Sequence, residues 1–231
     1  MNCRPRHRAK KRFRSFSHRG ASMYAFAVMF QSRCFCSLRF PFLVLLLTFT
    51  TSLAAQRGAL TTSQSIDELT QESTLIVRGY VTSAKVEPHP QFHNLMTVLV
   101  TMNVEDTLKG TAQKNLQFRQ YIWDIRDQLD AAQYGKNQEL LLMLGPVSQY
   151  GLRSPVGLEQ GRFRITRDAN GNTLAVNGRG NFHLFQSAEQ RAQARGIKLS
   201  ARVTALARRG AGGPVPLADL NDAIRSFARV K

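Results

Sequence analysis

The stretch EPHPQFH brings together residue types that bind metal ions. Glu87, His89 and His93 lie within seven residues of one another, and carboxylate and imidazole groups are ligands of zinc and related ions. Pro88 and Pro90 exclude a helix here, so the two histidines cannot share one helix face. The alternative is a solvated loop between two strands, because three candidate ligands on a flexible loop rarely form a site.

A second group is acidic. WDIRDQLD spaces Asp124, Asp127 and Asp130 three residues apart, and on a short helix these carboxylates would line one side. Such a row could suit calcium or a cationic partner, although the spacing matches no calcium-binding loop. The alternative is a connecting segment with a solvated acidic face and inward apolar side chains, which are Trp123, Ile125 and Leu129.

Cations and aromatic rings alternate with apolar residues along several predicted strands. Side chains of these two kinds bind single-stranded nucleic acid when they gather on one face of a sheet. Arginine on the outside of a strand also serves solubility and protects sheet edges, which is the plainer alternative. The candidates for a binding face are Arg78, Tyr80, Arg119, Tyr121, Arg162 and Arg164.

Known enzyme signatures are missing from the sequence. It has no G-x-S-x-G elbow, no P-loop and no dinucleotide fingerprint. The three cysteines, Cys3, Cys34 and Cys36, all precede the apolar export segment. His183 lies between aromatic residues, as packed histidines do, and no pair of acids is singled out for glycoside cleavage. We therefore expect a non-catalytic protein without a cofactor.

Residues 40–55, FPFLVLLLTFTTSLAA, have the pattern of a secretory signal. Cations precede a run of six apolar residues, and Ser52 and Ala54 are the small residues before a cleavage site near Ala54/Ala55. A membrane-spanning helix needs about 20 apolar residues, and this run is shorter. We expect a secreted or periplasmic protein. The alternative is an uncleaved anchor, which would be the protein's only contact with a membrane.

The basic residues ahead of the apolar run form an unusually long head for a signal. A start at Met29 would give a signal of ordinary length, so we interpret residues 1–28 as an over-called start; a nucleic-acid-binding arm is the alternative. Residues 1–55 carry ten of the 32 Lys and Arg and none of the 15 Asp and Glu. The remaining chain, with 22 Lys and Arg, has a net charge of +7 rather than +17, which is ordinary for an exported domain.

Behind the leader, alternating apolar residues predict a sheet. Leu75–Val86, Leu95–Val104 and Leu116–Trp123 alternate with the period of two that is typical of strands. Leu140–Leu144 is apolar throughout, as in a strand that is buried on both faces. Two shorter strands flank DANGN, where Asn-Gly favours a hairpin turn.

Gly79 interrupts the first predicted strand. Glycine inside a strand usually marks a bulge or a sharp bend. A small closed barrel needs such a bend so that one strand can serve both of its halves. We therefore expect the strands to close into a small barrel.

The last part of the chain is expected to be helical. Residues 187–209 have a helical composition with a break at Gly196, and a final helix is predicted from Leu217 to Arg229. Its apolar stripe, which should pack on the barrel or on the preceding helix, is Leu217, Leu220, Ile224 and Phe227.

Three segments, STLIVRGYVTSAKVE, TVLVTMNVEDTLKG and LLLMLGP, resemble the netrin-like, or tissue-inhibitor-of-metalloproteinase-like, variant of the OB-fold. SPVGLEQGRFRI adds a similarity to secreted bacterial proteins of this build. The resemblance covers about residues 70–180, and the positions that match the family's short strand motifs are Ser73, Leu75, Gly79, Val81, Val104, Lys109 and Gly110.

The resemblance implies a fold rather than a mechanism. Inhibitors of this family chelate zinc through an N-terminal cysteine, and the chain after residue 55 contains no cysteine. The same fold serves many functions, so the inhibitory activity does not carry over.

The predicted fold is mainly β. Residues 1–55 are expected to be a signal peptide with the over-called start, residues 56–180 a small OB-like barrel of five to six strands, and residues 181–231 a helical C-terminal extension.

The predicted function is that of an exported, non-catalytic binding protein with a protein or glycan surface as its partner. The contact regions would be the exposed barrel face or the loops at 87–94 and 145–160. Two alternatives remain open: a single-stranded nucleic-acid-binding OB domain, against which the export signal argues, and a metal-binding or metal-dependent hydrolytic module at Glu87, His89 and His93.

Overall fold

The computed structural model describes residues 61–229. The signal peptide, the basic head and the cleavage site near Ala54/Ala55 lie outside these residues. Among the helices that the structure describes, none combines the length and the apolar character needed to cross a membrane.

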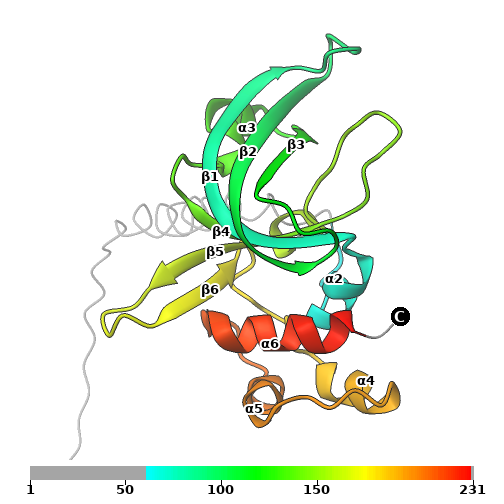
Figure 1. The fold of residues 1–231 in the computed structure, drawn as a ribbon, viewed down its shortest axis with the longest axis vertical. Coiled ribbons are helices and arrows are strands. Elements are labelled where there is room, and N and C mark those ends of the chain that lie inside the picture. The colour runs from blue at the N-terminus through cyan, green and yellow to red at the C-terminus, as the bar shows by residue number, and fades with distance from the viewer. Residues whose placement is uncertain (1–60, 230–231) are drawn as a thin grey trace, which may run out of the picture. The chain divides into compact units, whose positions relative to one another are not determined.

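A single antiparallel sheet organises the described chain (Figure 1). Its seven strands lie in the order β3-β2-β1-β4-β5-β6-β7. Their bounds are β1 Leu75–Pro88, β2 Met96–Lys109, β3 Asn115–Tyr121, β4 Glu139–Leu144, β5 Arg162–Arg167, β6 Thr173–Asn177 and β7 Val215–Pro216.

Five α-helices accompany the sheet within residues 61–229. They are α2 Ile66–Glu72, α3 Ile125–Leu129, α4 Ala188–Ala194, α5 Ala201–Arg209 and α6 Leu217–Ala228. Two single turns, η3 Ala131–Gln133 and η4 Leu158–Gln160, lie in the connections that flank β4. The architecture is therefore mixed α/β.

The predicted OB-like barrel is wrong, because the sheet of the described residues stays open. The outermost strands are β3 and β7, and they do not pair with each other. The chain that follows β4 reaches β3 only through one isolated bridge, between Arg119 and Leu152. Instead of closing on itself, the sheet buries one of its faces under helices, which is the other way to cover an apolar sheet face.

The bend predicted at Gly79 is present although the barrel is not. The β1–β2 ladder shifts register between Arg78 and Gly79, as well as at two other points, and both strands curve along their length (Figure 1). A Cβ atom on Gly79 would lie 2.0 Å from the carbonyl oxygen of Asn103 on β2. Only glycine permits this approach of the two backbones, so the residue is needed for the bend itself.

One apolar cluster, here called the strand-side cluster, fills the hollow of the curved sheet. It combines residues of β1, β2, β3 and β4 with Ala132 and Tyr134 from the connection before β4. Its buried strand residues are Leu75, Val77, Val81, Val98, Val100, Met102, Leu116, Phe118, Leu140, Leu142 and Leu144.

The second cluster, here called the helix-side cluster, lies between the sheet and α2, α4, α5 and α6 (Figure 1). The stripe predicted for the last helix is confirmed, because its four members are all buried there. The predicted break at Gly196 is confirmed too, since α4 ends before this residue and α5 begins after it. Residues 181–229 share this core with the strands, and β7 pairs with β6 across the boundary that we placed at residue 180.

Strand β4 belongs to both clusters. Leu140, Leu142 and Leu144 face the strand-side cluster, whereas Leu141 and Met143 face the helix-side cluster. All five side chains are fully buried, which confirms the prediction of a strand that is covered on both faces.

Candidate functional site

The predicted metal ligands lie at the end of the β1–β2 hairpin and are used in other contacts. Glu87 pairs with Arg119 at 2.6 Å. His89 is buried, its Nε2 lies 2.9 Å from the carbonyl oxygen of Tyr150 and its Nδ1 accepts a hydrogen bond from the backbone, while His93 is exposed. Within residues 61–229, no three His, Cys, Asp or Glu side chains are grouped in a way that could hold a metal ion.

The six candidates for a binding face do not form one surface. Residues directly opposite each other in a ladder share a sheet face. Arg78 lies opposite Leu141 of the helix-side cluster, whereas Arg164 lies opposite Leu140 of the strand-side cluster. The two arginines therefore lie on opposite faces of the sheet.

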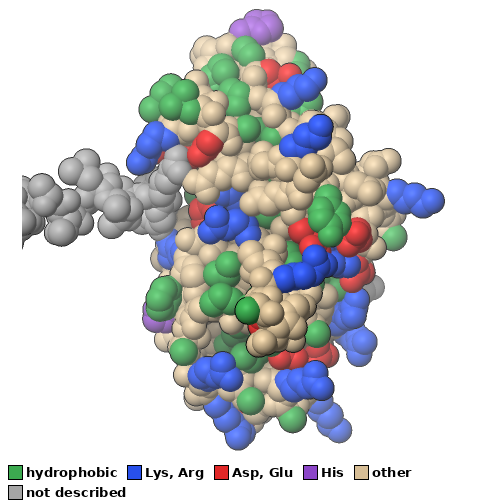
Figure 2. All heavy atoms as spheres, turned by 90° about the vertical axis from the view of Figure 1, so that its left-hand side faces the viewer, with side chains coloured by type: hydrophobic (Ala, Val, Ile, Leu, Met, Phe, Trp, Pro, Cys, Tyr) green, Lys and Arg blue, Asp and Glu red, His purple; other side chains and the backbone are tan. Residues whose placement is uncertain are grey.

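Several of these candidates are also paired within the protein. Arg78 forms ion pairs with Glu105 at 3.0 Å and Glu139 at 2.7 Å, and the hydroxyl of Tyr80 donates to Glu139. Arg119 is held by Glu87. On the face drawn in Figure 2, Lys and Arg side chains are spread over the surface with acidic side chains between them. This arrangement differs from the continuous basic path that single-stranded nucleic acid requires.

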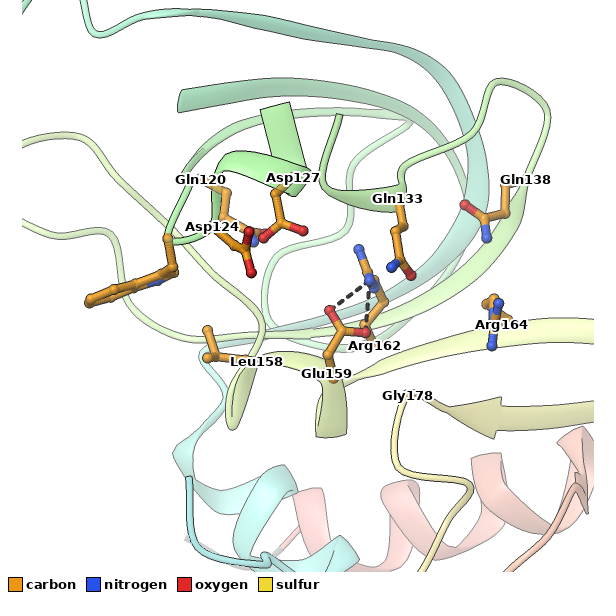
Figure 3. A pocket seen from close by; sticks show the side chains of 11 residues that line it. Gln120, Asp124, Asp127, Gln133, Gln138, Leu158, Glu159, Arg162, Arg164 and Gly178 are labelled. Carbon is orange, nitrogen blue, oxygen red and sulfur yellow. Dashed lines mark hydrogen bonds and ion pairs between the residues drawn. The ribbon is translucent and has the colours of Figure 1, made fainter. Parts of the chain in front are cut away.

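Arg162 and Arg164 meet other polar groups around a cavity of about 270 Å³, here called the Arg162 cavity (Figure 3). One side comes from the end of β3 and from α3, and it carries Gln120, Trp123, Asp124 and Asp127. The connection to β4 contributes Gln133 and Gln138, and the chain around β5 contributes Leu158, Glu159 and the two arginines. Gly178 completes the lining.

The buried guanidinium of Arg162 fastens the cavity walls to one another. Its Nη2 donates to both carboxylate oxygens of Glu159, at 2.6 and 2.7 Å, and its Nη1 donates to the carbonyl oxygen of Ala132. The guanidinium carbon also lies 4.8 Å from the ring centroid of Tyr134, in a cation–π contact. One side chain thus joins η4, η3 and β5.

Both walls contain backbone in the left-handed region. Ala131, Ala132 and Gln133 have φ angles of 49°, 53° and 62°, and Leu158 has a φ of 56° directly after Gly157. Non-glycine residues pay roughly 1–2 kcal/mol each in this conformation. Backbone strain of this kind persists only where surrounding contacts fix it, and it is concentrated at functional sites.

Hydrogen bonds from a distant segment fix the wall at η4. The amide of Gln160 donates to the carbonyl oxygen of Thr62 at 2.9 Å and accepts from the backbone N–H of Gln64 at 2.8 Å. Asn177 donates to the backbone carbonyl of Gln160 at 3.1 Å. The neighbouring Glu159 side chain points to Arg162 instead (Figure 3). A Cβ atom on Gly178 would collide with that Glu159 side chain, so glycine leaves room for it.

Tyr134 contacts two residues of the cavity lining, Gln120 and Arg162. Its hydroxyl donates a 2.7 Å hydrogen bond to Oε1 of Gln120, and its ring stands edge-on to Phe118. Burial raises the pKa of Tyr134 to about 12, because the phenolate would have to give up its hydration. The residue is therefore a neutral donor at any physiological pH.

The apolar side chains expected to turn inward at α3 do not. Trp123, Ile125 and Leu129 are 67%, 69% and 88% exposed, so this expectation is wrong. The helix has five residues, too few to present a stripe to the core. Its start is fixed instead by Asp124, whose carboxylate accepts from the backbone N–H of Arg126 and pairs with the Arg126 guanidinium.

The two loops that we proposed as contact regions contact each other. His89 of the first loop bonds the backbone of Tyr150 in the second, and the rings of Phe92 and Tyr150 meet edge-on at 5.4 Å. The second loop also supplies Leu158 and Glu159 to the Arg162 cavity.

Sequence reasoning named Arg162 and Arg164 as binding-face candidates and Asp124 and Asp127 as part of an acidic row, without placing the two groups together. It missed the amide groups of the cavity and placed Trp123 inward rather than at the rim. The sequence signal for this wall of the cavity was VGLEQGR, where Gly157 favours a left-handed turn next to an acidic and a basic residue. Comparisons of this chain with models of known protein families, with curated proteins and with solved structures found no match.

Proposed function

We propose that the protein is an exported, non-catalytic binding protein that holds a small polar ligand in the Arg162 cavity. The observation that carries the proposal is the preformed cavity itself, whose two strained walls are fastened by one buried guanidinium. Concave sites with a few convergent polar groups are where small ligands usually bind.

Rigidity supports a binding role. Binding is tighter when the residues that contact the ligand are already fixed, because less conformational entropy is lost on binding. Here Glu159 is fixed by Arg162, the η3 turn by the Ala132 carbonyl contact, and the η4 turn by Gln160. The left-handed residues show that the fold accepts a local cost to keep this shape.

The hydrogen bonds of two of the three lining carboxylates favour binding over catalysis. A general acid or base has to release or accept a proton at a reacting atom. Both carboxylate oxygens of Glu159 already accept hydrogen bonds from Arg162, and those of Asp124 accept from Arg126. Groups tied in this way serve better as fixed hydrogen-bond partners than as proton carriers.

The export part of the proposal is based on residues 40–55 and is tested separately. The protein should be expressed with its own start context in a bacterial host, fractionated, and its N-terminus sequenced. We expect a mature end near Ala55 outside the cytoplasm. An intact cytosolic chain that starts at Met1 would refute export.

The binding part is tested by nuclear magnetic resonance of the mature chain with ¹⁵N label. A panel of small neutral sugars, amino acids, dicarboxylates and polyamines is added, and the backbone amide shifts are mapped. We expect saturable shifts confined to cavity residues, such as Gln133, Glu159 and Gly178. Arg164→Ala should weaken the binding, whereas Arg167→Ala, on the same strand but outside the cavity, should not.

The binding proposal fails if no compound of the panel shifts the cavity amides, or if shifts occur only elsewhere on the surface.

A further inference from the structure

We infer that the ligand of the Arg162 cavity is a neutral glycan, one sugar ring of which stacks on Trp123. This inference rests on the proposed function and specifies its ligand class.

A largely exposed aromatic ring stands at the rim of the cavity. Trp123 lines the cavity and is 67% exposed, although burying an indole is strongly favourable. The ring of Tyr121 stands against it edge-on, with centroids 4.8 Å apart and planes at 81°. Beside this one ring contact, most of the indole stays open to solvent. An apolar platform beside a polar cavity suits a ligand with one apolar face and polar edges, as a sugar ring has.

The cavity offers separate donors and acceptors rather than one strong charge. Oε1 of Gln120 is taken by Tyr134 and Oε1 of Gln138 by the backbone N–H of Gly135, so both side chains present their NH₂ groups as donors. Asp127 and Glu159 bring carboxylate groups to the lining, and both oxygens of Glu159 also accept hydrogen bonds from Arg162. Hydroxyl groups both donate and accept, so a molecule with several hydroxyls can satisfy such a mixed lining.

The distribution of charge points to a neutral ligand. The lining holds three carboxylates and two guanidiniums, and the most buried cation, Arg162, is already neutralised by Glu159. The Arg164 side chain is exposed and has no hydrogen-bond or ion-pair partner within residues 61–229. A single unpaired cation can bind one ligand oxygen, but it is not the concentration of positive charge that nucleic acids or sulfated chains need.

Size limits what enters. A volume of about 270 Å³ lies just below the usual range for small-molecule pockets, roughly 300–1,000 Å³. It admits one ring of an oligosaccharide, with the next ring resting on the rim.

The chain contains a single tryptophan, so ligand stacking can be read directly from its fluorescence. Mature protein is titrated with cellotriose, maltotriose and triacetylchitotriose, and affinity is measured in parallel by calorimetry. We expect at least one of these neutral sugars to change Trp123 emission saturably. Trp123→Ala and Gln138→Ala should each lower its calorimetric affinity by about tenfold or more. Phe182→Ala, which removes an exposed aromatic ring outside the cavity, should leave affinity unchanged.

Controls separate this inference from the proposed function. If none of the three sugars binds, or if binding is insensitive to Trp123→Ala, the glycan inference is overturned. If in that case an amino acid, a dicarboxylate or a polyamine still shifts the cavity amides, the binding function stands without it. A heparin-derived disaccharide or oligothymidine that binds the cavity more tightly than the neutral sugars also overturns the inference.

Discussion

Arg191 on α4 donates two hydrogen bonds to the carboxylate of Asp67 on α2. Its Nε lies 2.6 Å from Oδ2 and its Nη2 lies 2.9 Å from Oδ1. The Asp67 side chain has no exposed surface, and the hydroxyl of Ser65 also donates to it at 2.7 Å. This bidentate pair connects α2 with α4. The two helices are far apart in the sequence but cover the same face of the sheet.

This ion pair makes the stability of the fold depend on pH in the acidic range. Burial alone would raise the pKa of Asp67, but hydrogen bonds from Arg191 and Ser65 outweigh it, and the pKa lies below its ordinary value of 3.8. Because the pKa of Asp67 is lower in the folded than in the unfolded protein, its ionisation stabilises the fold at pH values above the unfolded-state pKa. This contribution is lost as the pH falls through the pKa of the folded state. Asp67→Asn should cost about 2–3 kcal/mol at pH 7, less than a fully buried pair because Arg191 is partly exposed.

Urea unfolding at pH 7 and pH 3 measures both effects. The free energy of unfolding of Asp67→Asn should fall less between the two pH values than that of the unchanged protein. Asp222→Asn, at an exposed site on α6, is the matched control for the lost charge. If the free energy of unfolding fell equally between pH 7 and pH 3 in the unchanged protein and in Asp67→Asn, Asp67 would not be the source of the pH dependence.

Gly79 should tolerate no side chain. Because the added Cβ atom of Gly79→Ala would meet backbone rather than a movable side chain, we expect a loss of about 3 kcal/mol, at the upper end for overpacking. Gly135→Ala is the control, since the nearest atoms there are 3.8 Å away, and it should change stability by less than about 0.5 kcal/mol. Thermal and urea unfolding measure the stability of both variants. Equal stability would show that the close approach of β1 and β2 at Gly79 does not require glycine.

Tyr134 should ionise only at a pH well above the ordinary pKa of tyrosine. Its pKa of about 12 exceeds the ordinary value of 10, so its neutral form contributes stability below pH 10 that is lost as pH rises towards 12. Tyr134→Phe should flatten this alkaline loss, and it should also cost about 1–2 kcal/mol at pH 7 because Gln120 loses its donor. Tyr150→Phe, at a half-exposed site, is the control. Absorbance titration of phenolate checks the first statement and urea unfolding the second.

Lysine should not replace arginine at position 162. Lysine lacks the planar fork that contacts Glu159, the Ala132 carbonyl and the Tyr134 ring together. We expect Arg162→Lys to lower stability by about 2–4 kcal/mol, as for a buried pair that is broken. Arg167→Lys on the exposed end of the same strand should be neutral. Urea unfolding of both variants tests this, and a neutral Arg162→Lys would show that the guanidinium is not what fastens the cavity.

Local patterns predicted much of the secondary structure. The apolar run of β4 and the stripe of α6 were predicted correctly because burial sets their periodicity. DANGN forms the expected turn between β5 and β6, with the backbone N–H of Asp168 bonded to the carbonyl of Asn172. These features depend on residues that are neighbours in sequence.

Closure of the sheet and the shape of the cavity could not be predicted in the same way. Whether β3 meets another strand depends on contacts between distant segments, and β7 has only two residues, too few to leave a pattern. Alanine and glutamine have no preference for positive φ, so nothing in Ala131–Gln133 announces its left-handed turn. That turn is stabilised in part by a distant residue, because the Arg162 guanidinium donates to the carbonyl oxygen of Ala132.

The double burial of β4 makes the two apolar clusters cooperate in unfolding. If either cluster opened at β4, one side of Leu140–Leu144 would be exposed to water. We therefore expect the helices and the curved hairpin not to separate from this strand independently of each other. Its amide protons should exchange with deuterium only when the whole domain unfolds. The protection factor of β4 therefore reports the global stability of the fold, and with it the fraction of molecules in which the Arg162 cavity exists at all.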